Sequence, residues 1–279
     1  MQIKVGFIGG GNMAAGLIGG LVPGNIASKD VIVSEPNVER RAVLAEQFGV
    51  EITTDNNLVC QISDVVVLAV KPQIMAEVAQ QLELDESTPL FISIAAGISI
   101  SKLQNWLGSA AAYPIVRVMP NTPALVGCGA SGLFAGPGVN QQQKEIAQTL
   151  VDSVGISFWV DSETNLDLVT ALSGSGPAYF LLFIKALVDR ATQAGLSAKV
   201  AEALAMQTAI GAATLAKTSD DDLTTLIQNV TSPGGTTEKA LEVLNNKDVS
   251  AIIAEAFDAA QQRSEEMAVE FGSSFDNDK

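Results

Sequence analysis

The feature that most constrains the fold is a glycine motif that directly follows an apolar stretch at the start of the chain. Gly9, Gly11 and Ala14 match the pattern Gly-x-Gly-x-x-Ala, and Ile3–Val5 in front of them alternate as a strand does. Gly9 suits the tight turn after the strand, Gly11 lets the backbone approach a pyrophosphate, and Ala14 keeps the next helix close to the sheet. A second strand pattern follows at residues 31–34. The motif therefore predicts a dinucleotide-binding βαβ unit rather than a merely structural turn.

Short apolar runs alternate with helical patterns through the first half of the chain. The predicted strands are nearly continuously apolar, as strands buried on both faces are. They lie at Lys4–Gly9, Val31–Ser34, Val50–Thr53, Asp64–Val70, Pro89–Ala95 and Ile115–Met119. Helices are predicted at Val38–Phe48, Gln73–Gln81 and Ser99–Leu107, and two weaker strands, Ser131–Ala135 and Ile156–Val160, flank a helix at Gln141–Val154. This order predicts a Rossmann-type, doubly wound parallel sheet with ligands at the carboxyl ends of its strands.

After about residue 162 the pattern becomes helical and stays so. Apolar residues recur at three- and four-residue spacing in Leu166–Gly195, Ala198–Lys217, Asp221–Val230, Thr236–Asn245 and Val249–Phe271. We therefore expect an α/β fold class with a dinucleotide-binding domain at 1–162 and an all-helical domain at 163–279. Residues 178–186 and 201–216 are apolar around most of their circumference. A dimer interface explains this better than a large monomeric core, which remains the alternative.

The composition limits the chemistry and the partners. The chain has 31 acidic and 16 basic residues, no histidine, and a net charge of −15. Because it lacks a basic stripe, nucleic acid is not an expected partner. The absence of histidine removes the usual general base and the usual metal ligand, and no metal is expected.

The cysteines and apolar runs bear on location. Cys60 and Cys128 lack the spacing of a zinc site or a disulfide framework, which favours a reducing, cytoplasmic environment. We expect no signal peptide before the first strand, and apolar runs such as Val65–Val70 are too short to span a membrane.

A second glycine turn, at residues 229–238, begins one of the helical patterns. Pro233 suits a first helical turn, Gly234 and Gly235 let backbone amides approach an anion, and Ser and Thr hydroxyls surround them. The helix dipole adds about 0.3–1 kcal/mol of attraction for an anion. Such a segment can bind a carboxylate, although a hydroxyl-capped helix start is the simpler alternative. Two anion-binding loops in one chain indicate two ligands.

The end of the second predicted strand bears on the choice between NAD and NADP. Enzymes that use NAD usually place an acidic residue there, whereas NADP enzymes use small hydroxyls and cations. Ser34 favours NADPH, and Arg40 and Arg41 follow one turn later, but Glu35 keeps NADH open. Because strand residues alternate, Ser34 and Glu35 are expected to face opposite sides, with Glu35 outward if NADPH is used.

Three further loops follow the fourth, fifth and sixth predicted strands. In the second of them, Ala95–Gly97 are small enough to let a nicotinamide ring lie close to the backbone. In the third, Asn121 is a candidate to hydrogen-bond the carboxamide or the ribose. In the first, Lys71 is as easily explained as a solvated lysine at a strand end.

These segments together resemble pyrroline-5-carboxylate reductases. The resemblance is carried by Gly6–Ala14, Ala69–Pro72, Met119–Pro123, Leu172–Tyr179 and Val230–Thr237. The last two are specific, because other Rossmann reductases share the glycine motif but not these. The resemblance runs from the first strand to about residue 270. It implies reduction of 1-pyrroline-5-carboxylate to L-proline by NAD(P)H, the last step of proline biosynthesis, in an intertwined homodimer that often assembles into decamers.

The resemblance also implies site residues. It places cofactor contacts on Gly9, Gly10, Gly11, Asn12, Met13, Ser34, Asn56, Ala69, Val70, Lys71, Pro72, Ala95, Ala96, Gly97 and Asn229. It places substrate contacts on Glu163, Ser232, Gly235, Thr236 and Thr237. Thr237 is the catalytic candidate: its hydroxyl would contact the ring nitrogen and relay its proton, while Ser232 and the amides of Gly235 and Thr236 hold the carboxylate. Hydride transfer to a protonated C=N bond needs no strong base, which suits a chain without histidine.

Two rival functions remain open. A β-hydroxyacid dehydrogenase needs a lysine about one turn beyond the glycine motif that begins its helical domain, but Lys185 lies nine residues past Gly176. A non-catalytic NADP sensor or scaffold is the second rival, and the presence of both anion-binding loops with Thr237 argues against it. Neither Ser173 nor Ser175 is expected to be a nucleophile, because no histidine can activate it; Ser173–Pro177 instead predicts a helix start that faces the site.

Overall fold

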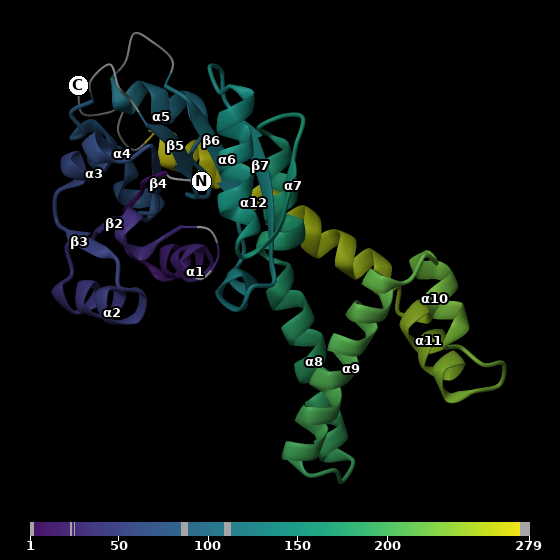
Figure 1. The fold of residues 1–279 in the computed structure, drawn as a ribbon. Coiled ribbons are helices and arrows are strands. Elements are labelled where there is room, and N and C mark those ends of the chain that lie inside the picture. Colours follow the sequence, from purple (N-terminus) through teal and green to yellow (C-terminus); the bar gives the residue numbers. More distant parts are fainter. Residues whose placement is uncertain (1–2, 23, 25, 85–88, 109–112, 274–279) are drawn as a thin grey trace. The chain divides into compact units, whose positions relative to one another are not determined.

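The computed structural model describes residues 3–22, 24, 26–84, 89–108 and 113–273. Their contacts divide the chain into two compact units. One consists of Met1–Ser175 together with Ala260–Lys279, and the other of Gly176–Ala259. The first unit contains all the strands that the structure describes, and the second is helical (Figure 1).

The first unit contains an eight-stranded sheet with the order β3-β2-β1-β4-β5-β6-β7-β8. Its strands are β1 Val5–Ile8, β2 Val31–Ser34, β3 Glu51–Thr53, β4 Val65–Leu68, β5 Leu90–Ser93, β6 Ile115–Met119, β7 Gly129–Ala135 and β8 Gly155–Trp159. Neighbouring strands are parallel, which confirms the predicted doubly wound sheet, with β7 antiparallel to β6 as the exception. Only nine residues separate Met119 from Gly129, and a parallel crossover needs a dozen or more.

Helices cover both faces of the sheet. On one face lie α1 (Asn12–Leu21), α2 (Val38–Phe48) and α6 (Gln141–Asp152), and on the other α3 (Asn56–Ile62), α4 (Pro72–Gln80) and α5 (Ile100–Leu107). Phe7 and Val67 pack on the first face, and Leu68 and Phe91 on the second. All four residues of β1, β2, β4 and β5 are buried, as their apolar runs predict. The sequence patterns missed α3, because its seven residues span barely two turns.

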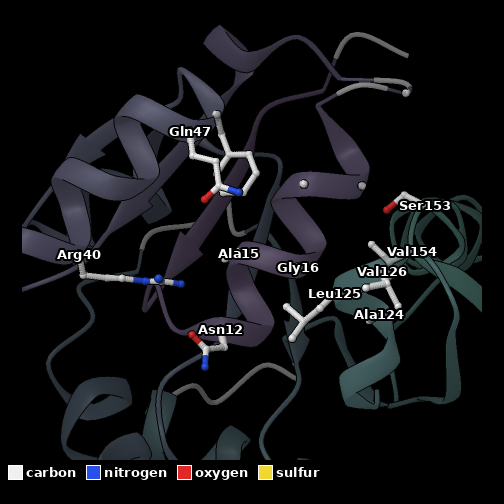
Figure 2. Close-up of a pocket in the computed structure, with 15 residues that line it drawn as sticks. Asn12, Ala15, Gly16, Arg40, Gln47, Ala124, Leu125, Val126, Ser153 and Val154 are labelled. Atoms are coloured by element: carbon white, nitrogen blue, oxygen red, sulfur yellow. The ribbon is translucent and has the colours of Figure 1, made fainter. Parts of the chain in front are cut away.

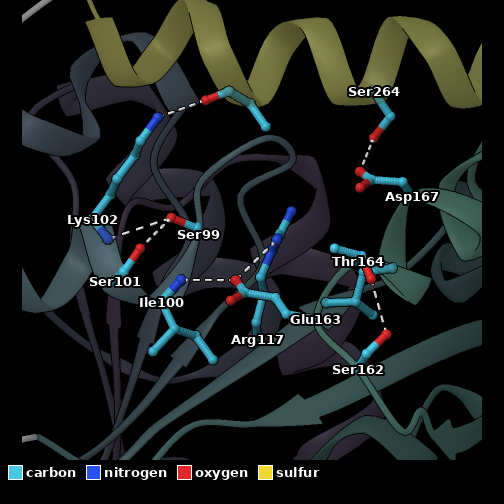
Figure 3. Close-up of polar contacts among 12 residues, drawn as sticks. Ser99, Ile100, Ser101, Lys102, Arg117, Ser162, Glu163, Thr164, Asp167 and Ser264 are labelled. Carbon is cyan, nitrogen blue, oxygen red and sulfur yellow. Dashed lines mark hydrogen bonds and ion pairs between the residues drawn. The ribbon is translucent and has the colours of Figure 1, made fainter.

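The rest of the first unit is short irregular helix and the end of the last helix. It contains the 3₁₀ turns η1 (Ser28–Asp30) and η2 (Thr122–Val126), the helix α7 (Asn165–Val169), and the π-helical turn η3 (Thr170–Gly174). The C-terminal part of α12 (Val249–Ser273) belongs here too. The hydroxyl of Ser264 donates to Asp167 Oδ1 and Lys102 Nζ donates to the carbonyl of Ala268, each at 2.6 Å (Figure 3). These bonds hold α12 against α7 and α5.

The second unit consists of α8 (Gly176–Gln193), α9 (Ala198–Thr218), α10 (Leu223–Asn229), α11 (Thr236–Asn246) and the first part of α12. Helices α8 and α9 pack against each other. Large apolar side chains nevertheless stay exposed in the single chain, such as Phe180 at 74% and Ile210 at 59%. The apolar circumference seen in the sequence is therefore not covered within one subunit.

The long predicted helix at Leu166–Gly195 is interrupted. The structure divides it into α7, η3 and α8, because the Ser–Gly–Ser–Gly–Pro segment does not sustain regular α-helical hydrogen bonds. By length and composition alone, the 29-residue run Asn165–Gln193 could cross a membrane. The expectation that the apolar stretches are too short to span a membrane therefore holds for Val65–Val70. It is wrong for the length of this run, in which Ser and Gly residues interrupt the apolar ones.

Candidate active site

The carboxyl ends of four neighbouring parallel strands lie side by side at one end of the sheet. In the strand register Ile8 pairs with both Ser34 and Leu68, and Leu68 pairs with Ser93. The loops that follow these strands therefore lie next to one another. A Cβ placed on Gly9 would lie only 2.9 Å from the carbonyl carbon of Ala69. The structure thus brings the glycine loop, the Ala69–Pro72 loop and the Ala95–Gly97 loop together at the carboxyl ends of the strands.

The glycine loop has the shape that a pyrophosphate needs. Gly9 has a φ of +97°, a conformation that residues with a Cβ rarely adopt, and its amide donates to the carbonyl of Ser34 at 2.9 Å. A Cβ on Gly11 would meet no atom within 4 Å, so the backbone there faces open space. Helix α1 begins at Asn12, which places the positive end of its dipole and its unpaired amides at this opening. These residues fit the diphosphate of a nicotinamide dinucleotide.

The end of β2 differs from the expectation in one respect. Ser34 is buried, and Glu35 points at the glycine loop rather than outward: its Oε2 accepts from the amide of Gly10 at 2.9 Å. The other carboxylate oxygen accepts from the amide of Asn37, also at 2.9 Å. Arg40 donates to the carbonyls of Gly10 and Gly11. A carboxylate and a guanidinium therefore both lie at the end of β2, where Rossmann-type domains generally read the adenosine ribose.

The other predicted cofactor residues of this unit lie at helix starts. Asn56 is the first residue of α3, whose N-terminus is capped by the side chain of Asp55. Lys71 is the exposed N-cap of α4, and Pro72 is the first residue of that helix. Among the residues that the structure describes, none forms a hydrogen bond or ion pair with the ammonium group of Lys71.

Asn121 has a structural task that the sequence did not reveal. Its side-chain Oδ1 accepts from the amide of Ala130, and its Nδ2 donates to the carbonyl of Ser173, each at 2.9 Å. One N–H and one lone pair of the side-chain amide are therefore used within the protein, and a second N–H and a second lone pair remain. This bridge ties the β6–η2 connection to η3, and π-helical turns of this kind are frequent at functional sites.

Glu163 lies in the segment between β8 and α7. Its Oε1 accepts two hydrogen bonds, from the amide of Ile100 at 2.8 Å and from Nη1 of Arg117 at 3.0 Å (Figure 3). Sequence reasoning missed Arg117, although a charge inside the apolar strand Ile115–Met119 is a visible signal. Nearby, Gly97 has a φ of +74° and packs closely on Phe271 of α12.

The remaining predicted site residues belong to the second unit. Asn229 is the last residue of α10, Ser232 and Gly235 lie in the turn before α11, and Thr236 and Thr237 are the first two residues of that helix. The amide of Gly235 donates to the carbonyl of Ser232 at 2.9 Å, which corrects the expectation that this amide holds a carboxylate. It closes the turn instead.

The turn before α11 keeps other donors available. Thr236 and Thr237 are the first two residues of the helix, so their amides have no intrahelical acceptor. Gly234, with a φ of +72°, donates its amide to Oε2 of Glu238 at 2.8 Å. The turn therefore offers two helix N-terminal amides and the hydroxyls of Ser232 and Thr237 to an anion.

The candidate for the lysine that a hydroxyacid dehydrogenase would need already has an ion-pair partner. Lys185 forms an exposed ion pair with Asp189, one turn along α8. In the described part of the chain, no group of three or more Cys, Asp and Glu side chains is arranged to hold a metal ion.

A pocket of about 890 Å³ lies beside α1. Arg40 and Gln47 border it on one side of the helix, and Leu125, Val126 and Val154 on the other (Figure 2). Of the predicted cofactor residues, its lining includes Asn12. The pocket thus adjoins the glycine loop but does not extend across the strand ends.

Comparisons with known proteins match two separate segments of the chain. Residues 4–97 match the family model of NADP oxidoreductases described as coenzyme F420-dependent. Residues 163–267 match the pyrroline-5-carboxylate reductase dimerisation model.

The sheet, its glycine loop and the helical unit define the class of the protein: it is an oxidoreductase with a Rossmann-type nucleotide-binding domain. It is 44% identical to a pyrroline-5-carboxylate reductase of Pseudomonas aeruginosa over 96% of this chain and 98% of the relative. The solved reductase of Coxiella burnetii is 40% identical with a TM-score of 0.91, covering 96% of this chain and 99% of its own. The Plasmodium falciparum enzyme with NADP bound is 33% identical with a TM-score of 0.85, covering 96% and 98%. The chain belongs to the pyrroline-5-carboxylate reductase family.

Proposed function

We propose that the chain carries out the reaction of its family through the two anion-binding helix starts described above. It is an NAD(P)H-dependent oxidoreductase that reduces the C=N bond of 1-pyrroline-5-carboxylate to give L-proline, the last step of proline biosynthesis. The observation that carries the site assignment is the presence of two such helix starts. One, at α1, suits a diphosphate, and the other, at α11, suits a carboxylate.

The cofactor lies along the strand ends in this proposal. Gly9–Met13 hold the diphosphate, Ser34 and Asn56 lie at the adenosine end, and Ala69–Pro72 and Ala95–Gly97 border the nicotinamide, with Asn229 added from α10. When bound, the reduced nicotinamide supplies the hydride. NADPH is the favoured form because Arg40 and Arg41 follow β2, and the relative from P. falciparum was solved with NADP.

The substrate carboxylate binds at the start of α11. The amides of Thr236 and Thr237 and the hydroxyl of Ser232 are its donors, and Gly235 leaves the backbone uncovered. The hydroxyl of Thr237 contacts the ring nitrogen, which must be protonated for its C=N carbon to accept a hydride readily, and Glu163 is a further substrate contact. Hydrogen bonds that strengthen as charge shifts in the transition state accelerate the step without a strong base.

The helical domain carries out dimerisation, as its family model states. Its exposed apolar side chains, including those within Asn165–Gln193, are covered by a second copy of the chain in this proposal. We further propose that such dimers assemble into decamers and that the protein is cytoplasmic. The boundary between the dinucleotide-binding and helical domains lies at about residue 162 in this proposal.

Initial rates test the function directly. We expect rapid oxidation of NADPH at 340 nm with 1-pyrroline-5-carboxylate, slower oxidation of NADH, and no reduction of NADP⁺ with a 3-hydroxyacid. Activity with the hydroxyacid alone would instead indicate a hydroxyacid dehydrogenase with Lys185 as its catalytic candidate. If nucleotide bound but neither substrate turned over, the chain would be a nucleotide-binding protein without this activity.

A further inference from the structure

Arg117 is a buried cation on a largely apolar face of the sheet. It is 7% exposed, and its neighbours across the strands are Ser93 of β5 and Phe134 of β7. Placing a guanidinium there is costly unless an acceptor compensates its charge. Apolar residues of ordinary size fill this face elsewhere, for example Ile115 two residues earlier in β6. An arginine at this position therefore calls for an explanation other than packing.

The acceptor for Arg117 is Glu163. The two side chains are 9% and 25% exposed, whereas those of the Lys185–Asp189 pair are 69% and 52% exposed. Exposed pairs contribute little to stability, while a sheltered pair is held in a defined geometry. The pair joins residues 46 positions apart, and the amide of Ile100 adds a third segment to it (Figure 3).

Only one oxygen of the Glu163 carboxylate is used. Arg117 and Ile100 both donate to Oε1, while Oε2 has no partner among the residues that the structure describes. With two donors on one oxygen the carboxylate cannot rotate without breaking both bonds. Oε2 is therefore a fixed acceptor beside the first turn of α5, on a side chain that is 25% exposed.

We propose that Arg117 is a positioning residue that holds Glu163 so that Oε2 receives an N–H of the substrate. The acceptor fits a cationic ring nitrogen, as in the protonated imine and in the ammonium group of the product. The guanidinium also offsets part of the charge of Glu163, which reduces its repulsion of the carboxylate on the same ligand. The proposal rests on the assignment of Glu163 to the substrate site.

Four variants test the proposal: Arg117→Met, Arg117→Lys, Glu163→Gln and the double variant Arg117→Met/Glu163→Gln. Glu163→Gln keeps one acceptor oxygen for Arg117 and Ile100 and replaces the other acceptor by a donor. The measurements are kcat/KM for 1-pyrroline-5-carboxylate, the inhibition constant of L-proline, and the Kd of NADPH from its fluorescence.

We expect Arg117→Met to lower kcat/KM at least tenfold and to weaken inhibition by L-proline, while the Kd of NADPH stays within twofold. Arg117→Lys, which keeps a charged donor, should recover kcat/KM to within about threefold of the unaltered chain. The double variant should be no worse than Glu163→Gln alone, because contacting residues that act through each other are not additive. Arg263→Met, which removes a cation from two ion pairs at the surface of α12, is the control and should change none of these values.

Different outcomes reject different claims. If the losses of the two single variants multiply in the double variant, or if the Kd of NADPH rises in step with the loss of kcat/KM, Arg117 does not act through Glu163. If Glu163→Gln stays within twofold of the unaltered chain, Glu163 is not a substrate contact and the proposal fails with that premise. An unaltered chain that does not turn over the imine would instead reject the proposed function. If Arg117→Met does not fold, Arg117→Lys becomes the deciding variant. A tenfold loss of kcat/KM in soluble Arg117→Lys would then reject the proposal.

Discussion

Glu35 Oε2 accepts a hydrogen bond from the amide of Gly10 at 2.9 Å, so the loop shaped for a diphosphate already carries one carboxylate of its own chain. The same arrangement recurs in the second unit, where Glu238 Oε2 accepts from the amide of Gly234 at 2.8 Å. In both places an acidic side chain stiffens a glycine turn. It also places a negative charge beside the position at which an anionic ligand is expected.

Glu35→Gln should shift the cofactor preference toward NADPH. The side chain of the introduced glutamine keeps an acceptor for the Gly10 amide but removes the negative charge near the 2′-phosphate. Like charges about 4 Å apart cost about 1 kcal/mol even in bulk water. We expect the ratio of kcat/KM for NADPH to that for NADH to rise about fivefold. Steady-state kinetics with both nucleotides measure it, and Glu39→Gln on the exposed side of α2 is the control. A ratio that falls would show that Glu35 does not repel the 2′-phosphate.

Glu238→Gln should lower the KM for 1-pyrroline-5-carboxylate two- to fivefold without changing kcat, because like-charge repulsion of the substrate carboxylate is worth about 1 kcal/mol or less at an exposed turn. The difference should shrink as salt is added. Glu242→Gln, one turn further along α11, is the matched control. A raised KM would mean that the turn needs the carboxylate to keep its shape.

Thr237→Ala should lower kcat/KM by about ten- to a hundredfold, since a hydrogen bond lost in the transition state costs about 1–3 kcal/mol. Thr237→Ser keeps the hydroxyl and should retain most of the activity. Rates at saturating NADPH measure both. The proposed role of Thr237 is wrong if the alanine variant stays within twofold of the unaltered chain.

Gly9→Ala and Gly11→Ala should separate stability from binding. At Gly9 the left-handed backbone and the contact of 2.9 Å with Ala69 make a Cβ costly, by about 1–3 kcal/mol or more. At Gly11 a Cβ meets no protein atom but fills the space offered to the diphosphate. We expect a lower melting temperature for Gly9→Ala, and an unchanged one with a raised Kd for NADPH for Gly11→Ala. Equal melting temperatures would contradict the first expectation, and an unchanged Kd the second.

The two thiols should react differently. Burial raises the pKa of Cys60 from 9.0 to about 12, so in the folded protein at pH 8 it stays protonated and unreactive, whereas Cys128 is exposed. A disulfide reagent should modify one thiol in the folded chain and two after denaturation. Because the folded state raises this pKa, the contribution of Cys60 to stability is complete below about pH 9 and is lost progressively as the pH rises toward 12. Cys60→Ala should remove that part of the pH dependence.

Much of the architecture can be predicted from the sequence because its signals are local. Continuous β-branched runs such as Val65–Leu68 form buried strands, and Gly9 and Gly11 mark a turn that follows one. The helical period after residue 162 and the Gly–Gly turn before Thr236 depend likewise on neighbouring residues. The family resemblance rested on these same segments, and the comparisons confirm it.

Other features were decided by the tertiary structure, because side-chain direction depends on neighbours that are distant in the sequence. The strand β7 pairs antiparallel to β6 because its connection is short. Glu35 turns toward Gly10, 25 residues away, and Asn121 bridges Ala130 and Ser173. No local pattern links Arg117 to Glu163, since a buried cation takes whichever carboxylate the fold brings within reach. The sequence alone thus determined the elements and the class of ligand, and packing alone determined which polar groups remain available to bind it.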